Sequence, residues 1–118
     1  MEWTVYLPSS GAILGTRIRW ARGIGERFVG LMGTRELPRG AGLLFPHTNA
    51  VHGFFMRYPI QLLYIGRDQT ILAKAALPPW RIGPIVRGAY YVLELPVGVA
   101  DAVSIGERVE WKKTGKTS

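Results

Sequence analysis

Glycine and proline interrupt this chain so often that long regular elements have little room to form. Fifteen glycines and eight prolines are spread over 118 residues, and both residue types are typical of turns. Between them lie short runs of β-branched, aromatic and aliphatic residues, which favour β-strands. We expect strands over residues 1–7, 13–21, 42–45, 51–56, 61–65, 71–76, 89–95 and 107–112. By contrast, the three prolines between residues 77 and 84 predict a stiff loop, because proline removes hydrogen-bond donors from a sheet.

One stretch, at about 24–33, has the spacing of a helix instead. Its apolar positions fall at i, i+4, i+7 and i+8, on one helical face, and are Ile24, Phe28, Leu31 and Met32. The sequence therefore predicts an α+β fold, a β-rich small barrel or half-barrel. Its strands should be short and mostly antiparallel, and this one helix should close it.

The chain has the length and composition of one domain. No linker or repeat divides residues 1–118, and 47% hydrophobic residues can supply one core. Residues 112–118 carry three lysines, and we expect them to form a basic, flexible tail. No run approaches the ~18 apolar residues of a membrane span, and the N-terminus lacks the pattern of a signal peptide. We therefore expect a cytoplasmic protein with no membrane span.

The absence of cysteine excludes several kinds of chemistry. Disulfides, thiolate metal sites and a cysteine nucleophile all require thiols, and the chain has none. Two histidines alone cannot supply the three or four ligands of a zinc site, so we expect neither a metal nor another cofactor. The net charge of +7 suits polyanionic partners. Dispersed arginines more often serve solubility, and these run from Arg17 to Arg108.

Six tracts occur along the chain in the order that characterises one family. They are Glu26–Met32, Gly42–Phe45, His52–Ile60, Pro79–Arg81, Val92–Gly98 and Ile105–Glu107. Through them, residues 21–109 resemble the uncharacterised prokaryotic family known as domain of unknown function 192. The resemblance implies a β-rich α+β fold, and it brings no established activity, cofactor or catalytic residue.

The chain departs from this family's pattern at two acidic positions. The family usually has Asp where this chain has Gln61, and it usually has Asp where this chain has Glu107. Glutamine forms hydrogen bonds but cannot act as a base. Any chemistry that relied on an acid at position 61 would therefore be missing here.

The tract His52–Ile60 carries the first candidate binding residues. In a strand, Phe55 and Arg57 share one face, and a ring beside a guanidinium suits a planar or anionic group. Alternatively, Arg57 extends over Phe55 to solvent. His52 titrates near neutrality and could contact a ligand or act as a general base. Its other interpretation is a strand histidine that bonds to the backbone.

Two further segments supply the remaining candidates. Trp80 follows two prolines and precedes Arg81, so it is a stiff aromatic that could stack on a ligand or cover an open barrel end. Glu94 lies in an apolar strand, where an unpaired carboxylate would be costly if buried. It should face solvent or pair with Arg27, Arg57 or Arg81. A buried Arg27–Glu94 ion pair is the structural alternative to a functional Glu94.

These features favour a non-enzyme. No phosphate-binding loop, dinucleotide-binding glycine pattern or nucleophile elbow is present. Our leading hypothesis is a non-catalytic ligand-binding or interaction module, with an aromatic and arginine groove where 52–57, Trp80, Arg81 and Glu94 converge. Its partner would be a small ligand or a protein. One alternative is a small hydrolase or transferase that uses His52 with an acidic partner. The other is nucleic-acid binding through a basic surface.

Overall fold

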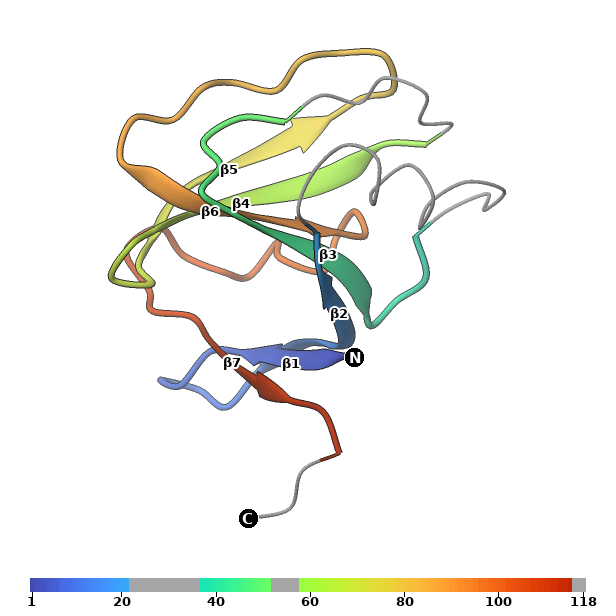
Figure 1. The fold of residues 1–118 in the computed structure, drawn as a ribbon, viewed down its shortest axis with the longest axis vertical. Coiled ribbons are helices and arrows are strands. Elements are labelled where there is room, and N and C mark those ends of the chain that lie inside the picture. The colour runs from blue at the N-terminus through green and yellow to red at the C-terminus, as the bar shows by residue number, and fades with distance from the viewer. Residues whose placement is uncertain (22–36, 52–57, 116–118) are drawn as a thin grey trace.

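The computed structural model describes residues 1–21, 37–51 and 58–115 (Figure 1). Within these ranges seven strands form one sheet, in the order β5-β4-β6-β3-β2-β1-β7. The strands are β1 (Trp3–Tyr6), β2 (Ile13–Trp20), β3 (Ala41–Pro46), β4 (Ile60–Gly66), β5 (Ile71–Leu77), β6 (Ala89–Leu95) and β7 (Glu110–Lys113). They match the expected strands to within three residues at each end. The expected strand at 51–56 falls almost wholly on 52–57, outside the described residues.

Neighbouring strands are antiparallel with one exception, the pair β2 and β3. A parallel pair needs a long connection, and this one runs from residue 21 to residue 40. The β4–β5 pair is a hairpin whose turn lies where glycine and aspartate predicted it, at residues 66–70. Short, mostly antiparallel strands are therefore confirmed.

The prediction of an α+β barrel or half-barrel closed by a helix is wrong. The described ranges contain strands and no helix, and the strands form one open sheet. The helix predicted at about 24–33 falls on residues 22–36, outside the described residues. The helix was expected to close the core. The curvature of the sheet and the segment that leads into β7 already enclose it.

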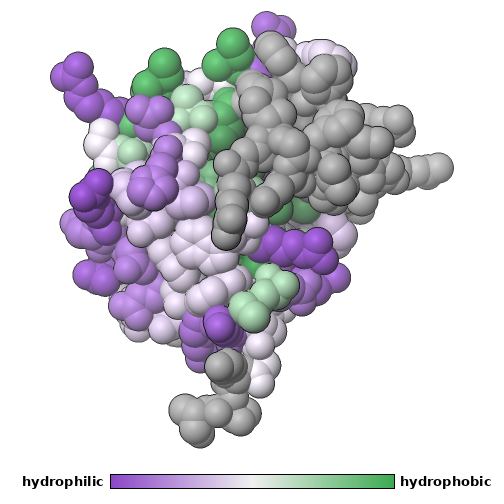
Figure 2. Space-filling view, in the orientation of Figure 1, coloured by the Kyte–Doolittle hydropathy of each residue, from purple (hydrophilic) through white to green (hydrophobic). Residues whose placement is uncertain are grey.

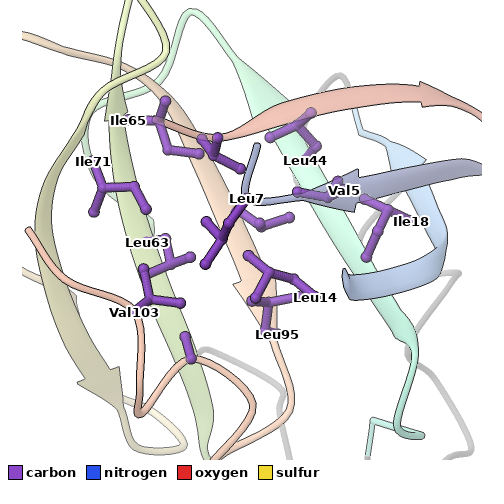
Figure 3. Packing of buried hydrophobic residues seen from close by; sticks show 13 residues of the cluster. Val5, Leu7, Leu14, Ile18, Leu44, Leu63, Ile65, Ile71, Leu95 and Val103 are labelled. Carbon is purple, nitrogen blue, oxygen red and sulfur yellow. The ribbon is translucent and has the colours of Figure 1, made fainter. Parts of the chain in front are cut away.

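The sheet curls so that its two edge strands approach each other at one end. The Ile71 amide, at the start of β5, donates to the Glu107 carbonyl at 2.8 Å. The Val109 amide, just before β7, donates to the Gln69 carbonyl at 2.9 Å. Inside the curl lie thirteen buried apolar residues from β1 to β6 and from the segment before β7 (Figure 3). Each fully buried Leu or Ile contributes about 1.5–3 kcal/mol.

The outer face of the sheet is apolar as well, which explains the unbroken hydrophobic run in β4. Leu63 and Ile65 point into the curl, whereas Leu62 and Tyr64 point to the outer face, and all four are fully buried. The loop over residues 78–88, between β5 and β6, packs against this outer face and crosses the top of the molecule in Figure 1. As its prolines predicted, it forms no strand. A search of the described residues found no helix long and apolar enough to cross a membrane.

Candidate functional site

The candidate residues that the structure describes come from one end of the central strands. At this end β4 begins, and β5 and β6 end. The register shows this, since Ile60 lies opposite Leu77 and Gln61 lies opposite Leu95. Glu94 is next to the end of β6, and the loop 78–88 leaves β5 at the same end. Trp80 and Arg81 belong to this loop.

Four predicted residues lie outside the described ranges: Arg27, His52, Phe55 and Arg57. The residues on either side of the tract 52–57 are described. Tyr58 is buried in the outer-face cluster and Val51 packs against that cluster. The chain therefore enters and leaves this tract at the outer face of the sheet.

Glu94 is a fully buried carboxylate in the middle of the sheet. It lies opposite Leu43 on β3 and Leu62 on β4, and 0% of its surface is exposed. Leu93 and Leu95 point into the curl, so alternation directs Glu94 to the outer face. Of the two sequence interpretations, a solvent-facing Glu94 is therefore wrong. A carboxylate buried to this degree requires a cation or hydrogen-bond donors.

Glycine at position 42 is required by the backbone that carries Glu94. A Cβ at Gly42 would lie 2.5 Å from the Glu94 carbonyl oxygen and 2.8 Å from Ile18 Cδ1. Backbone cannot yield in the way that the end of a side chain can. Strands β3 and β6 therefore approach each other at the start of β3 only because this position has no side chain.

Gln61, at the position where the family resemblance suggested an acid, has a structural contact here. Its Oε1 accepts a hydrogen bond of 3.2 Å from the Ala100 amide. The contact fixes the loop that follows β6 against the start of β4. At this position an amide oxygen performs a positioning role that needs no charge.

The inner side of the loop 78–88 is fixed to the protein by three hydrogen bonds. The Gly83 amide donates to the Val51 carbonyl at 2.8 Å, and the Val86 amide donates to the Asn49 carbonyl at 3.0 Å. The Tyr64 hydroxyl donates to the Pro84 carbonyl at 2.7 Å. Burial raises the pKa of Tyr64 above its usual value, so the hydroxyl stays protonated and keeps this bond at neutral pH.

The loop also lies in tight contact with β4. A Cβ at Gly83 would lie 3.1 Å from Leu62 Cδ1, from the Tyr64 hydroxyl oxygen and from the Val51 carbonyl oxygen. Such spacing leaves no room for a side chain unless the neighbours move. The loop backbone is therefore held in place by packing as well as by hydrogen bonds.

The outer side of the same loop displays apolar side chains. Trp80, Ile82 and Ile85 are 59%, 71% and 75% exposed. Figure 2 shows hydrophobic side chains gathered at the top of the molecule, over this loop. Trp80 has a φ of 64°, a left-handed conformation that a bulky residue adopts at a cost of about 1–3 kcal/mol. Such backbone strain is often found at functional positions.

The charged side chains of the loop are all positive. Arg81 and Arg87 are exposed, and residues 78–88 contain no acid. Sequence reasoning identified Trp80 and Arg81 but missed Ile82 and Ile85, because the exposed fraction of an apolar side chain depends on what covers it in the folded chain. The three prolines were the available signal, since they predicted a loop and loops run over surfaces.

A second group that sequence reasoning missed lies at the opposite end of β6. The Tyr90 hydroxyl oxygen and His47 Nε2 are 3.0 Å apart, and the Arg67 guanidinium carbon lies 4.5 Å from the Tyr90 ring centroid. Tyr91 and Trp111 continue the row of rings, with centroids 5.0 Å apart. No three His, Asp or Glu side chains in the described ranges are grouped so that they could hold a metal ion. We interpret the group as packing at the end of the core.

Comparison with known proteins finds relatives over nearly the whole chain. The family model of domain of unknown function 192, described as an uncharacterised ACR, matches residues 5–111. A UPF0127 protein of Pyrococcus furiosus is 33% identical over 113 residues, which cover 89% of this chain and 95% of that protein.

Two solved structures share the fold. A protein of unknown function from Novosphingobium aromaticivorans has a TM-score of 0.72 and 25% identity, over 92% of this chain and 83% of that one. A Sinorhizobium meliloti protein, which its description proposes to be a transcription regulator, has a TM-score of 0.69 and 29% identity. That match covers 92% of this chain and 91% of the other.

Proposed function

The chain belongs to the family of domain of unknown function 192, whose members have no assigned function, and we propose that it is a non-catalytic interaction module. Its docking surface is the outer side of the loop 78–88. Its partner is a polypeptide segment that offers apolar and acidic side chains.

One observation carries this proposal: Trp80, Ile82 and Ile85 are each more than half exposed on a loop whose backbone is fixed. Contiguous exposed apolar side chains mark interaction sites. Because the backbone is already ordered, binding costs little conformational entropy. The same side chains on a flexible loop would lose more conformational entropy on binding.

The charge of the loop indicates the chemistry of the partner. Arg81 and Arg87 stand beside the apolar side chains, and the loop has no acid of its own. Acidic side chains on the partner would complement the two guanidiniums, and apolar ones would cover the isoleucines. Tryptophan and arginine, the types of Trp80 and Arg81, are among the residues that most often dominate binding energy at interfaces.

Three predicted groove residues lie outside the described ranges and stay predictions. His52, Phe55 and Arg57 belong to the tract between Val51 and Tyr58, the two residues that pack on the outer face beneath the loop. We include these three residues as ligand-binding candidates. Glu94 supports the site from below instead, because a fully buried carboxylate cannot touch a partner in solution.

In the hydrolase or transferase alternative His52 would act with an acidic partner, and the same burial weighs against Glu94 in that role. Nucleic-acid binding is the other alternative, and the Sinorhizobium meliloti protein of similar fold is described as a proposed transcription regulator. The exposed arginines that the structure describes are spread over different segments. They are Arg17 and Arg19 on β2, Arg39 before β3, Arg67 in the β4–β5 turn, Arg81 and Arg87 in the loop 78–88, and Arg108 before β7. This spread favours a protein partner over a polyanion.

The test begins with peptides selected against the protein from a random peptide library. Their affinities are then compared for the wild type, the double variant Ile82→Ser/Ile85→Ser, and the control Val97→Ser/Ile105→Ser, whose residues are also more than half exposed but lie outside the loop. We expect apolar, acidic peptides that bind the loop variant at least about tenfold more weakly and bind the control unchanged. Trp80→Ala should weaken binding in the same way.

Three results would overturn the proposal. Selected peptides that bind the loop variant as tightly as the wild type would place the surface elsewhere. Binding of duplex DNA that falls steeply with salt would favour the nucleic-acid alternative. Loop-dependent binding to anionic lipid vesicles, with no peptide selected, would replace the polypeptide by a membrane surface.

A further inference from the structure

A pocket of about 320 Å³ opens where the start of β2 meets the loop that follows β6. Three short segments line it: residues 13–16, 39–40 and 98–99. None of them belongs to the loop 78–88, so this pocket is independent of the surface proposed above. Its volume lies near the lower end of the range of about 300–1,000 Å³ for small-molecule sites.

Two of its walls are held together by one carbonyl group. The Gly40 carbonyl oxygen accepts hydrogen bonds from the Thr16 amide at 3.1 Å and from the Arg17 amide at 2.8 Å. A Cβ at Gly15 would lie 2.8 Å from the same oxygen. The start of β2 and the residues before β3 therefore form one close-packed unit.

The third wall is held by hydrogen bonds to the loop that follows β6. The Lys74 ammonium donates to the carbonyl oxygens of Ala100, Asp101 and Val103, at 3.2, 3.3 and 2.7 Å. Gln61 accepts from the Ala100 amide. With all three walls fixed, the pocket is formed before any ligand arrives, which lowers the entropic cost of binding.

One side of the pocket is positively charged. Arg39 lines it, and Arg17 Nη2 donates to the Arg39 carbonyl oxygen at 3.0 Å, which brings the two residues together. Arg17 Nη2 also lies 4.0 Å from the position that a Cβ of Gly40 would take. Within the described ranges, neither guanidinium has a carboxylate partner. Both are therefore available to an anion.

The rest of the lining combines three apolar side chains with Thr16 and the backbone of three glycines, and none of the lining residues is an acid. Ile13, Leu14 and Val99 contribute hydrocarbon surface, and Ile13 is 60% exposed. Gly98, with a φ of 95°, leaves open the space that a side chain would fill. Asp101 is not among the lining residues, although its Oδ2 lies 3.9 Å from the position of a Gly98 Cβ.

We propose that this pocket binds a small organic carboxylate with a short apolar tail. The Arg39 guanidinium pairs with the carboxylate, because its planar fork matches two carboxylate oxygens, and Arg17 adds a second positive charge. Ile13, Leu14 and Val99 contact the tail. A charged head and a hydrocarbon tail together use both sides of the lining, whereas an inorganic anion would use one.

The test is calorimetric titration of the full chain with hexanoate, with hexanol and inorganic phosphate as comparison ligands. We expect saturable hexanoate binding, and at least about tenfold weaker binding of both comparison ligands. Arg39→Gln should weaken hexanoate binding at least about tenfold, and Arg67→Gln, in the exposed β4–β5 turn outside the pocket lining, should leave it unchanged. The Arg39 guanidinium has no carboxylate partner among the described residues, so Arg39→Gln should melt at the wild-type temperature, which separates lost binding from lost folding.

Any of three results overturns the proposal. Hexanoate binding that is absent up to about 10 mM would mean that the pocket has no useful affinity for this class. Binding unaffected by Arg39→Gln would place the carboxylate elsewhere. Phosphate that binds as tightly as hexanoate would remove the role of the apolar lining. None of these results bears on peptide binding by the loop 78–88.

Discussion

The Tyr64 hydroxyl donates a 2.7 Å hydrogen bond to the Pro84 carbonyl oxygen, and this bond joins the core of the sheet to its most exposed loop. Tyr64 is fully buried on β4. Pro84 lies between Ile82 and Ile85, whose side chains are 71% and 75% exposed. The core beneath the proposed docking surface therefore sets its conformation. Substitutions in the core should alter the loop conformation even though they leave the exposed side chains of the loop unchanged.

Tyr64→Phe should loosen the loop and lower stability. The change removes the donor to Pro84 and leaves that carbonyl without this partner, at an expected cost of about 1–3 kcal/mol. Urea unfolding measures the free energy, and hydrogen exchange of the Gly83 and Val86 amides measures the loop. Tyr90→Phe is the matched control, because the Tyr90 hydroxyl meets His47 at an exposed position. Equal losses in both variants would contradict a special role for Tyr64.

Tyr64 should also make the free energy of unfolding depend on pH in the alkaline range. Burial raises the pKa of folded Tyr64 above its usual value of 10.0. The unfolded chain therefore releases this proton first. The contribution is fully present below about pH 10 and is lost as pH rises through the folded pKa.

Thermal unfolding of the wild type and Tyr64→Phe from about pH 8 to about pH 12 measures this effect. The wild type should lose more stability than the variant across that range. Tyr6, whose pKa is raised by its hydrogen bond to Glu110, acts in the same direction. The double variant Tyr6→Phe/Tyr64→Phe should therefore depend least on pH. Parallel curves for all three proteins would show that Tyr64 titrates in the folded protein as it does in the unfolded chain.

Alanine substitutions at two glycines should differ in severity. At Gly42 the new Cβ would meet the Glu94 carbonyl oxygen at 2.5 Å, and backbone in the sheet centre cannot move away easily. At Gly83 two of the three contacts, at 3.1 Å, are with the ends of the Leu62 and Tyr64 side chains, which can shift. We expect Gly83→Ala to cost about 1–3 kcal/mol and Gly42→Ala to cost more. Denaturant unfolding of both variants gives the order, and the reverse order would contradict the packing described.

Lys74→Met should destabilise the loop that follows β6. The Lys74 ammonium donates to three carbonyl oxygens in that loop, and hydrogen bonds to a charged group contribute about 1.5–3 kcal/mol. Methionine keeps most of the apolar stem without the charge. Lys112→Met, at an exposed position on β7, is the control. Similar melting temperatures for the two variants would show that the ammonium contributes nothing to holding the loop.

The positions of the strands could be predicted from sequence because glycine and proline mark their ends. The segment Ala89–Leu95 was predicted to the residue, and the proline-rich stretch after Leu77 was correctly excluded from the sheet. The fold class was wrong because periodicity cannot show how a sheet curls. The run Leu62–Ile65 shows no alternation of polar and apolar residues, because both faces of the strand are buried there. The parallel pairing of β2 with β3 likewise depends on contacts between distant segments.

The candidate site was predictable in part, for a similar reason. Sequence identified Trp80 and Arg81 as chemically unusual, and it showed that a buried Glu94 would need a partner. It could not show that Ile82 and Ile85 are exposed, because the exposed fraction of an apolar side chain depends on what covers it. The carboxylate pocket was equally hidden, since residues 13–16, 39–40 and 98–99 meet only in the folded chain.

The central claim, that the loop 78–88 is a docking surface, is tested most directly by mapping a bound peptide on the isotopically labelled protein. A selected peptide is titrated in, and the amide shifts are followed residue by residue. We expect the largest changes to fall on the amides from Trp80 to Arg87, while those of β7 stay unchanged. Changes centred on β1 and β7, with an unaffected loop, would contradict it.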